Sequence, residues 1–303
     1  MSGKVVGGRG ARVSLGNISL HLAAVSCALF VSAAALAADT HVPADSRLKT
    51  ILAKKVIRIA YRADARPFAF ANDAKEPLGY TIDLCKQVAK SIEQQFGSSE
   101  LRIEWVPVTV ETRFSAVASG KADLECGSST VTLGRMKEID FSNLVFVEST
   151  GVLVAAASNI HSFAEMAGKK IAVVSGTTNE RVATEQVRAR NLNATLVAVK
   201  DRDEAIAALE AGKVDGFASD KLLLAGAQIK HPEALVMLPD DLSIEQYAIV
   251  LPRGDWAFRL AVNTGLAQIF RTAKTTDLFE RWFFGSRPGI LLEALYALGR
   301  ISD

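Results

Sequence analysis

The fold is decided by the stretch Leu124-Glu-Cys-Gly-Ser-Ser-Thr-Val-Thr-Leu-Gly-Arg135 more than by any other twelve residues. It places a glycine, the hydroxyls of Ser128 and Thr130, and an arginine between an apolar strand-like run and a helix-like run. Hydroxyls, free N–H groups at a helix N-terminus and a guanidinium all donate to carboxylates. The stretch therefore predicts a strand, a turn and a helix that bind an anion. The alternative is a strand–turn–helix in which Ser or Thr only caps the helix.

A second stretch of the same kind is Val173-Val-Ser-Gly-Thr-Thr-Asn-Glu180, again an apolar run, a glycine, hydroxyls and a helix-like run. Two such segments predict one ligand held from two sides. Around them, short β-branched runs alternate with helical patterns, which indicates an α/β fold with mainly parallel sheets flanked by helices. Strands are expected over 55–61, 101–108 and 122–127, and helices over 79–96 and 112–119.

An internal similarity divides the chain. The run Ala116–Leu124 resembles Ala208–Gly216, and each reads as a helix end, a C′ glycine and entry into a strand. We expect two similarly built lobes, a clamp with lobe 1 over 38–147 and 247–303 and lobe 2 over 148–246; chance reuse of a helix terminator is the alternative. Extended crossings at 146–154 and 245–251 would form the hinge. Helical segments at 255–284 and 290–298 would return to lobe 1.

The N-terminus has the pattern of a secretory signal peptide over residues 1–37. Lys4, Arg9 and Arg12 precede an apolar run from His21 to Ala37; an uncleaved anchor is the alternative. Removing this segment takes three of the 35 basic residues and none of the 33 acidic ones, so the net charge changes from +2 to −1. The remaining chain has no basic surplus for nucleic acid or anionic membrane.

Cysteine and histidine positions argue against a metal or a thiol nucleophile. Cys85 and Cys126 remain after export and either form a disulfide or stay as buried thiols. His41, His161 and His231 are scattered without the spacing of metal ligands. We expect no cofactor, no metal and a monomeric protein.

Residues 48–284 also resemble a known family, the family 3 solute-binding proteins of bacterial polar amino-acid ABC transporters, and in particular its glutamate/aspartate-binding members. The resemblance implies a periplasmic two-lobed clamp of type II that delivers its ligand to permease subunits in the inner membrane. The motifs that carry it are Tyr61-Arg62…Pro67-Phe68, Gly79-Tyr80…Asp83-Leu84, Gly120-Lys-Ala-Asp123, Cys126-Gly-Ser-Ser-Thr130 with Arg135, Asp140-Phe141-Ser142, Ser175-Gly-Thr-Thr178, Leu223-Leu-Ala-Gly226 and Asp220.

The resemblance also implies roles for individual residues. Arg135 would pair with the ligand α-carboxylate, assisted by Ser128, Thr130 and N–H groups around Thr177 and Thr178, and Asp220 would take the α-ammonium. A zwitterion needs a fixed cation and a fixed anion, because either charge is costly to bury unpaired.

The side-chain end of the ligand would meet Arg62 and Arg113, which match two family arginines. Arg202 stands where those members have a histidine, and Val110 where they have a serine. A third arginine favours an acidic ligand, L-glutamate or L-aspartate, although Val110 removes a donor. Each arginine could instead form a structural ion pair. Phe68 would stack on the ligand methylenes or belong to the core.

Two further functions compete with transport. The same fold hosts a secreted cyclohexadienyl dehydratase, whose chemistry needs an acid or base in the cleft; Glu125 and Glu180 are the candidates. A ligand sensor for a membrane receptor would share the binding site. Arg135 together with Asp220 favours a zwitterion binder, so we expect a binding protein and not an enzyme.

Overall fold

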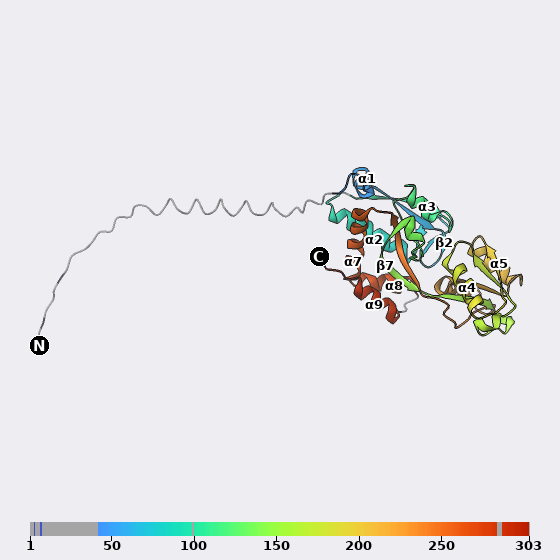
Figure 1. Ribbon diagram of the computed structural model, residues 1–303. Helices are drawn as coiled ribbons and strands as arrows, with labels where there is room; N and C mark the ends of the chain where they lie inside the picture. Colours follow the sequence, from blue (N-terminus) through green and yellow to red (C-terminus); the bar gives the residue numbers. More distant parts are fainter. Residues whose placement is uncertain (1–2, 4–6, 8–41, 99, 284–286, 303) are drawn as a thin grey trace. The chain divides into compact units, whose positions relative to one another are not determined.

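The computed structural model describes residues 3, 7, 42–98, 100–283 and 287–302 (Figure 1). The signal peptide expected over residues 1–37 lies outside the described residues, apart from two isolated glycines. No helix in the described part of the chain combines the length and apolarity needed to cross a bilayer.

Sheet I has five strands in the order β5-β1-β6-β13-β7. β5, β1 and β6 are parallel, whereas β13 and β7 run antiparallel to their neighbours, so parallel pairing holds on one side of the sheet only. The strands are β1 (Val56–Arg62), β5 (Arg102–Val108), β6 (Leu124–Glu125), β7 (Ile139–Glu148) and β13 (Glu245–Pro252).

Sheet II repeats this plan in the order β10-β9-β11-β8-β12. Its first three strands are parallel, and β8 and β12 are antiparallel. Together, the two mixed sheets make the two similar halves that the internal similarity predicted. The strands are β8 (Thr150–Ala155), β9 (Lys170–Val174), β10 (Thr195–Val199), β11 (Gly216–Asp220) and β12 (Leu235–Met237). A small third sheet holds β2 (Asp64–Ala65), β3 (Ala69–Ala71) and β4 (Pro77–Leu78).

The repeated sequence pattern has the predicted geometry in both halves. α3 (Arg113–Ala118) is followed by Gly120 at φ +82, and α5 (Arg202–Glu210) by Gly212 at φ +65. Glycine adopts this left-handed conformation without steric cost, and it directs the chain into β6 and β11, the third strand of each sheet.

The chain passes between the sheets through extended segments, as predicted. Only Ser149 separates β7 from β8, and the chain returns to sheet I at the start of β13. The Leu242 N–H donates to the Thr150 carbonyl, which joins the two crossings (2.9 Å).

Helices carry the apolar faces that the sequence predicted. α2 (Tyr80–Gln95) buries Ile82, Cys85, Val88 and Ile92 against sheet I. Cys85 forms a disulfide with Cys126, so the first of the two alternatives for these cysteines is observed. The remaining helices in the described part of the chain are α1 (Arg47–Lys54), α4 (Thr178–Ala189), α6 (Lys221–Lys230), α7 (Trp256–Phe270), α8 (Lys274–Trp282) and α9 (Ile290–Leu298), with 3-10 turns at Arg135–Lys137, Ala156–Ser158 and Phe163–Met166.

Phe68 belongs to the core and is fully buried. Its ring packs edge-on against Phe146 (4.8 Å between centroids) and Tyr247 (5.2 Å). The C-terminal helix α9 joins the same core through Tyr296, whose hydroxyl lies 2.7 Å from that of Tyr80. Of the two interpretations of Phe68, packing on the ligand and packing in the core, its contacts therefore match the second.

Candidate functional site

The first predicted segment is a loop and not the start of an α-helix. β6 ends at Glu125, and the next helical residues are the 3-10 turn Arg135–Lys137. The reason is local crowding followed by long-range pairing. A Cβ at Gly127 would lie 2.2 Å from Glu125 Oε1, so a larger residue here would clash with that buried carboxylate. Thr130 then forms an antiparallel bridge with Tyr247 of β13.

The loop presents hydroxyls at a buried position. The Thr81 hydroxyl donates to the Gly127 carbonyl (3.0 Å) and anchors the loop on α2. Ser128 Oγ is buried and meets no hydrogen-bond partner among the described residues. A buried polar atom without a partner is uncommon in proteins. Ser128 is thus available to donate to a ligand.

The second segment has the strand–glycine–helix form that was predicted. β9 is followed by Gly176 at φ +74 and by Thr177, the N-cap of α4. The Thr177 hydroxyl accepts from the Glu180 N–H (3.2 Å), and the Glu180 carboxylate accepts from the Gly176 N–H (2.8 Å). The Thr177 side chain therefore caps the helix, and what this segment offers an anion is the N-terminus of α4.

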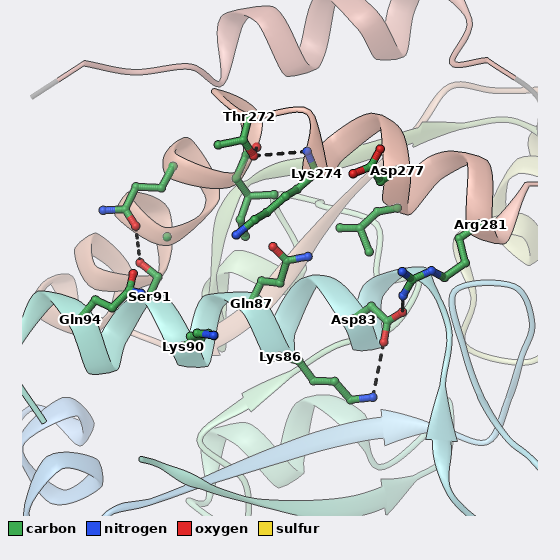
Figure 2. Close-up of a pocket in the computed structure, with 14 residues that line it drawn as sticks. Asp83, Lys86, Gln87, Lys90, Ser91, Gln94, Thr272, Lys274, Asp277 and Arg281 are labelled. Carbon is green, nitrogen blue, oxygen red and sulfur yellow. Dashed lines mark hydrogen bonds and ion pairs between the residues drawn. The ribbon is translucent and has the colours of Figure 1, made fainter. Parts of the chain in front are cut away.

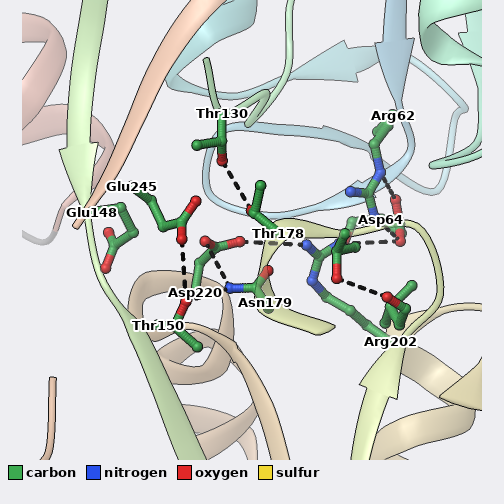
Figure 3. Close-up of polar contacts among 12 residues, drawn as sticks. Arg62, Asp64, Thr130, Glu148, Thr150, Thr178, Asn179, Arg202, Asp220 and Glu245 are labelled. Atoms are coloured by element: carbon green, nitrogen blue, oxygen red, sulfur yellow. Dashed lines mark hydrogen bonds and ion pairs between the residues drawn. The ribbon is translucent and has the colours of Figure 1, made fainter. Parts of the chain in front are cut away.

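Arg135 brings the two segments together. Its Nη1 donates to the Thr130 carbonyl (2.7 Å) and its Nη2 to the Gly176 carbonyl (3.5 Å). The hydroxyls of Thr130 and Thr178 lie 3.2 Å apart (Figure 3). Burial lowers the pKa of Arg135, and the carboxylates of Glu245, Glu125 and Asp220 oppose that shift.

Three more arginines lie near Arg135 or near one another, and all three are buried: Arg62 is 1% exposed, Arg113 2% and Arg202 6%. Burial and the neighbouring guanidinium groups of Arg62 and Arg135 lower the pKa of Arg113 to about 9. Arg113 Nε has no hydrogen-bond partner in the described part of the chain. Cations this close destabilise one another, so the cluster favours an added anion.

Arg62 and Arg202 share one carboxylate, that of Asp64 (Figure 3). Arg62 comes from the end of β1 and Arg202 from the start of α5. Their ion pairs with Asp64 measure 2.6 Å and 3.2 Å. The predicted arginines thus come together, and both carry the structural ion pair that was the alternative to ligand binding.

Asp220 belongs to sheet II and lies where β11 ends and α6 begins. Asn179 Nδ2 donates to its carboxylate (3.2 Å), and Arg202 Nη2 lies 4.0 Å away. Burial, with a contribution from the Glu245 carboxylate, raises the pKa of Asp220. Glu245 Oε2 is buried without a partner among the described residues. This surplus of buried negative charge favours a cation such as an ammonium group.

Glu148 adds a third acidic group here, because β7 and β13 pair it with Glu245. Burial raises the pKa of Glu148 to about 8, with Asp220 contributing. A glutamate in an unfolded chain titrates at about 4.3. Between these two pH values the folded protein holds one more proton than the unfolded chain, so its free energy of unfolding falls as pH rises and levels off above pH 8.

We therefore expect the free energy of unfolding of the Glu148→Gln variant to fall less steeply with rising pH. For one titrating group this fall reaches about 1.4 kcal/mol per pH unit. Urea unfolding of both proteins at pH 5.5 and 8.5 measures the effect. The exposed Glu138, changed to Gln, is the matched control. If the free energy of unfolding depends on pH equally in the unmodified protein and in Glu148→Gln, the raised pKa of Glu148 is contradicted.

The two carboxylates considered for acid–base chemistry have structural contacts. Glu125 is fully buried and accepts from the Ser129 hydroxyl (2.8 Å). Glu180 accepts from the Gly176 N–H at the start of α4. Glu180 is therefore engaged at a helix end, whereas Glu125 Oε1 is buried without a partner among the described residues, and burial raises the pKa of Glu125. Among the described residues, no group of His, Cys, Asp and Glu side chains is arranged to hold a metal ion.

Of the hollows in the described part of the chain, one borders this cluster and another lies away from it. A cleft of about 880 Å³ is lined by Asp64, Val110 and Gly176 and borders the site. Val110 packs with Val174 and Val199 of sheet II, so the residue standing in place of a serine contributes apolar packing. A second hollow of about 530 Å³ lies between α2 and α7–α8 and contains none of the predicted residues (Figure 2).

Sequence reasoning missed Asp64, Glu148 and Glu245. Asp64 lies two residues after Arg62, and side chains two apart on extended chain point to the same side, so this spacing could have revealed it. Glu148 and Glu245 meet only through the pairing of β7 with β13, which no local pattern encodes.

Comparisons with known proteins agree with this architecture. The family model described as bacterial extracellular solute-binding proteins, family 3, matches residues 57–285. A glutamate/aspartate import solute-binding protein of Escherichia coli K12 is 28% identical over 264 residues, covering 86% of this chain and 87% of the relative. An L-glutamate/L-aspartate-binding protein of Pseudomonas aeruginosa PAO1 is 29% identical over 239 residues, covering 78% and 79%.

A solved structure shares the fold. It is an ancestral amino acid-binding protein described as a precursor of cyclohexadienyl dehydratase, with a TM-score of 0.69 and 26% identity. The match covers 78% of this chain and all of that one. The fold of the present chain is the two-lobed periplasmic-binding-protein fold, as predicted.

Proposed function

Because this chain belongs to the bacterial extracellular solute-binding proteins, family 3, we propose that it binds an amino acid between its two lobes and delivers it to the permease of an ABC importer. Lobe 1 would comprise residues 38–147 and 247–303, and lobe 2 residues 148–246. Export through the signal peptide would bring the protein to the periplasm, where it would meet the permease subunits as a monomer.

One observation carries the proposal: a guanidinium and a carboxylate from the two sheets face the same buried region. Arg135 follows the loop of sheet I, and Asp220 ends β11 of sheet II. The Asp220 carboxylate is close enough to act on the pKa of Arg135. An amino-acid zwitterion matches this pair, because its carboxylate would meet Arg135, Ser128 and the N-terminus of α4, and its ammonium would meet Asp220.

The side-chain end supports an acidic ligand, L-glutamate or L-aspartate. Arg62, Arg113 and Arg202 are buried cations near one another, and Arg113 Nε has no hydrogen-bond partner in the described part of the chain. The two relatives named above carry glutamate and aspartate in their names. A distal carboxylate would relieve the repulsion among these guanidinium groups.

The contacts of Glu180 and of Glu125 Oε2 favour structural roles over elimination chemistry, because Glu180 accepts from the Gly176 N–H and Glu125 Oε2 from the Ser129 hydroxyl. The curated relatives are binding proteins. We therefore assign this chain no reaction.

A thermal-shift screen of the common amino acids tests the proposal. We expect L-glutamate and L-aspartate to raise the melting temperature, and lysine, arginine and histidine to leave it unchanged, because buried arginines repel a cationic side chain. At a concentration about 100 times its dissociation constant, a ligand adds about 2.7 kcal/mol to the free energy of unfolding. Stabilisation by glutamine but by neither acidic amino acid would refute the acidic preference and leave amino-acid binding intact.

A further inference from the structure

The Asp64 carboxylate occupies the guanidinium fork of Arg62. Arg62 Nε donates to Oδ1 (2.9 Å) and Nη2 to Oδ2 (2.6 Å), a bidentate pair. This is the geometry in which arginine recognises a carboxylate ligand. Arg62 is almost wholly buried, whereas the side chain of Asp64 is 29% exposed beside the cleft.

The same carboxylate also reaches the other half of the molecule. Arg202 Nη1 donates to Asp64 Oδ2 (3.2 Å) and lies 3.5 Å from the Asp64 carbonyl oxygen. Arg202 is the first residue of α5, where the helix dipole disfavours a cation, so it needs an anion nearby. Burial raises the pKa of Asp64, but Arg62 and Arg202 outweigh burial and hold that pKa below its ordinary value.

Two of the three arginines expected to bind a ligand's distal carboxylate therefore already hold one that belongs to the chain. A second carboxylate at the same donors would face the first, and like charges this close repel. We infer that Asp64 is a built-in competitor of the ligand side chain, which an acidic amino acid must displace; this inference rests on the proposed function.

Asp64 would act differently on an amide ligand. The side-chain NH2 group of glutamine is a donor and can bond to the Asp64 carboxylate without displacing it. Asp64 thus weakens the binding of glutamate without weakening that of glutamine, which lowers the preference of the site for glutamate. It is a residue that sets specificity through an unfavourable contact with one ligand class.

Isothermal titration of glutamate and glutamine into the protein and its Asp64→Asn variant tests this inference. We expect the ratio of the glutamine to the glutamate dissociation constant to rise at least about tenfold in the variant. Asp64→Glu keeps the charge and should leave the ratio near its original value. Asp73→Asn removes an exposed carboxylate from the turn between β3 and β4 and is the matched control.

A second measurement uses the unmodified protein, because a variant that leaves Arg62 unpaired could lose its fold. With 13C-labelled aspartate, the Asp64 carboxyl resonance should move towards that of a carboxylate without an arginine partner when glutamate binds. It should shift less when glutamine binds, because the ion pair with Arg62 is then kept. An unmoved resonance with glutamate bound would overturn the inference.

The outcomes separate the two hypotheses. If the unmodified protein binds glutamate and a folded Asp64→Asn variant shows no rise in the ratio, Asp64 is not a competitor and the proposed function stands. If the unmodified protein binds no amino acid, the proposed function fails and the inference fails with it.

Discussion

Replacing Arg135 by alanine is expected to lower the affinity for the amino acid by about a hundredfold or more, while the protein stays folded. The guanidinium would pair with the ligand α-carboxylate, and a buried carboxylate without its partner costs several kcal/mol. Arg135 belongs to a short 3-10 turn and is only partly buried, so the core does not depend on it. Titration calorimetry with glutamate, and with whichever amino acid stabilises the protein most, measures the loss.

Arg102→Ala is the matched control, because Arg102 is an exposed arginine at the start of β5 paired with Glu104. Its loss should leave affinity unchanged. An Arg135→Ala variant that is folded by circular dichroism and binds with the original affinity would remove Arg135 from the site.

Removing the disulfide is expected to have the largest effect on stability. The bond joins Cys85 of α2 to Cys126 after β6, with a sequence separation of 41. Closing a loop of this length restricts the unfolded chain and stabilises the fold by about 4 kcal/mol in the chain-entropy model. For a protein of this size each kcal/mol corresponds to about 2–4 °C, so Cys85→Ser with Cys126→Ser should melt about 10 °C lower.

Reductant supplies the control for this effect. It should lower the melting temperature of the protein with both cysteines towards that of the double variant, and it should not change the double variant itself. Identical melting curves with and without reductant would show that the bond contributes nothing to stability.

Most elements could be predicted because their signals are local. The spacing of Ile82, Cys85 and Val88 defines α2. Gly120 and Gly212 follow their helices in the left-handed conformation, which glycine adopts without steric cost. The α-helix expected at the end of 124–135 was wrong, since a 3-10 turn forms at Arg135–Lys137, and the reason is non-local: Thr130 pairs with Tyr247 of a strand far along the chain. No pattern within 124–135 encodes that partner.

The residues of the candidate site were also predicted only in part. Arg62, Arg202 and Asp220 were singled out by family resemblance, and they lie together. What they bond to was not predicted. The Asp64 carboxylate accepts from Arg62 and Arg202, whose N–H groups were expected to bind a ligand. The pairing of Glu148 with Glu245 depends on which strands are neighbours. Composition identifies charges, but only the fold decides which charges neutralise one another.

The position of β13 has a consequence for the order of folding during synthesis. Sheet II is built from one continuous stretch between β8 and β12, so it can form as soon as that stretch emerges. Sheet I cannot, because β13 lies between β6 and β7 and is made last of all the strands. Until then β6 and β7 keep unpaired edges. The half that begins the chain is therefore completed last, after the half that follows it in sequence.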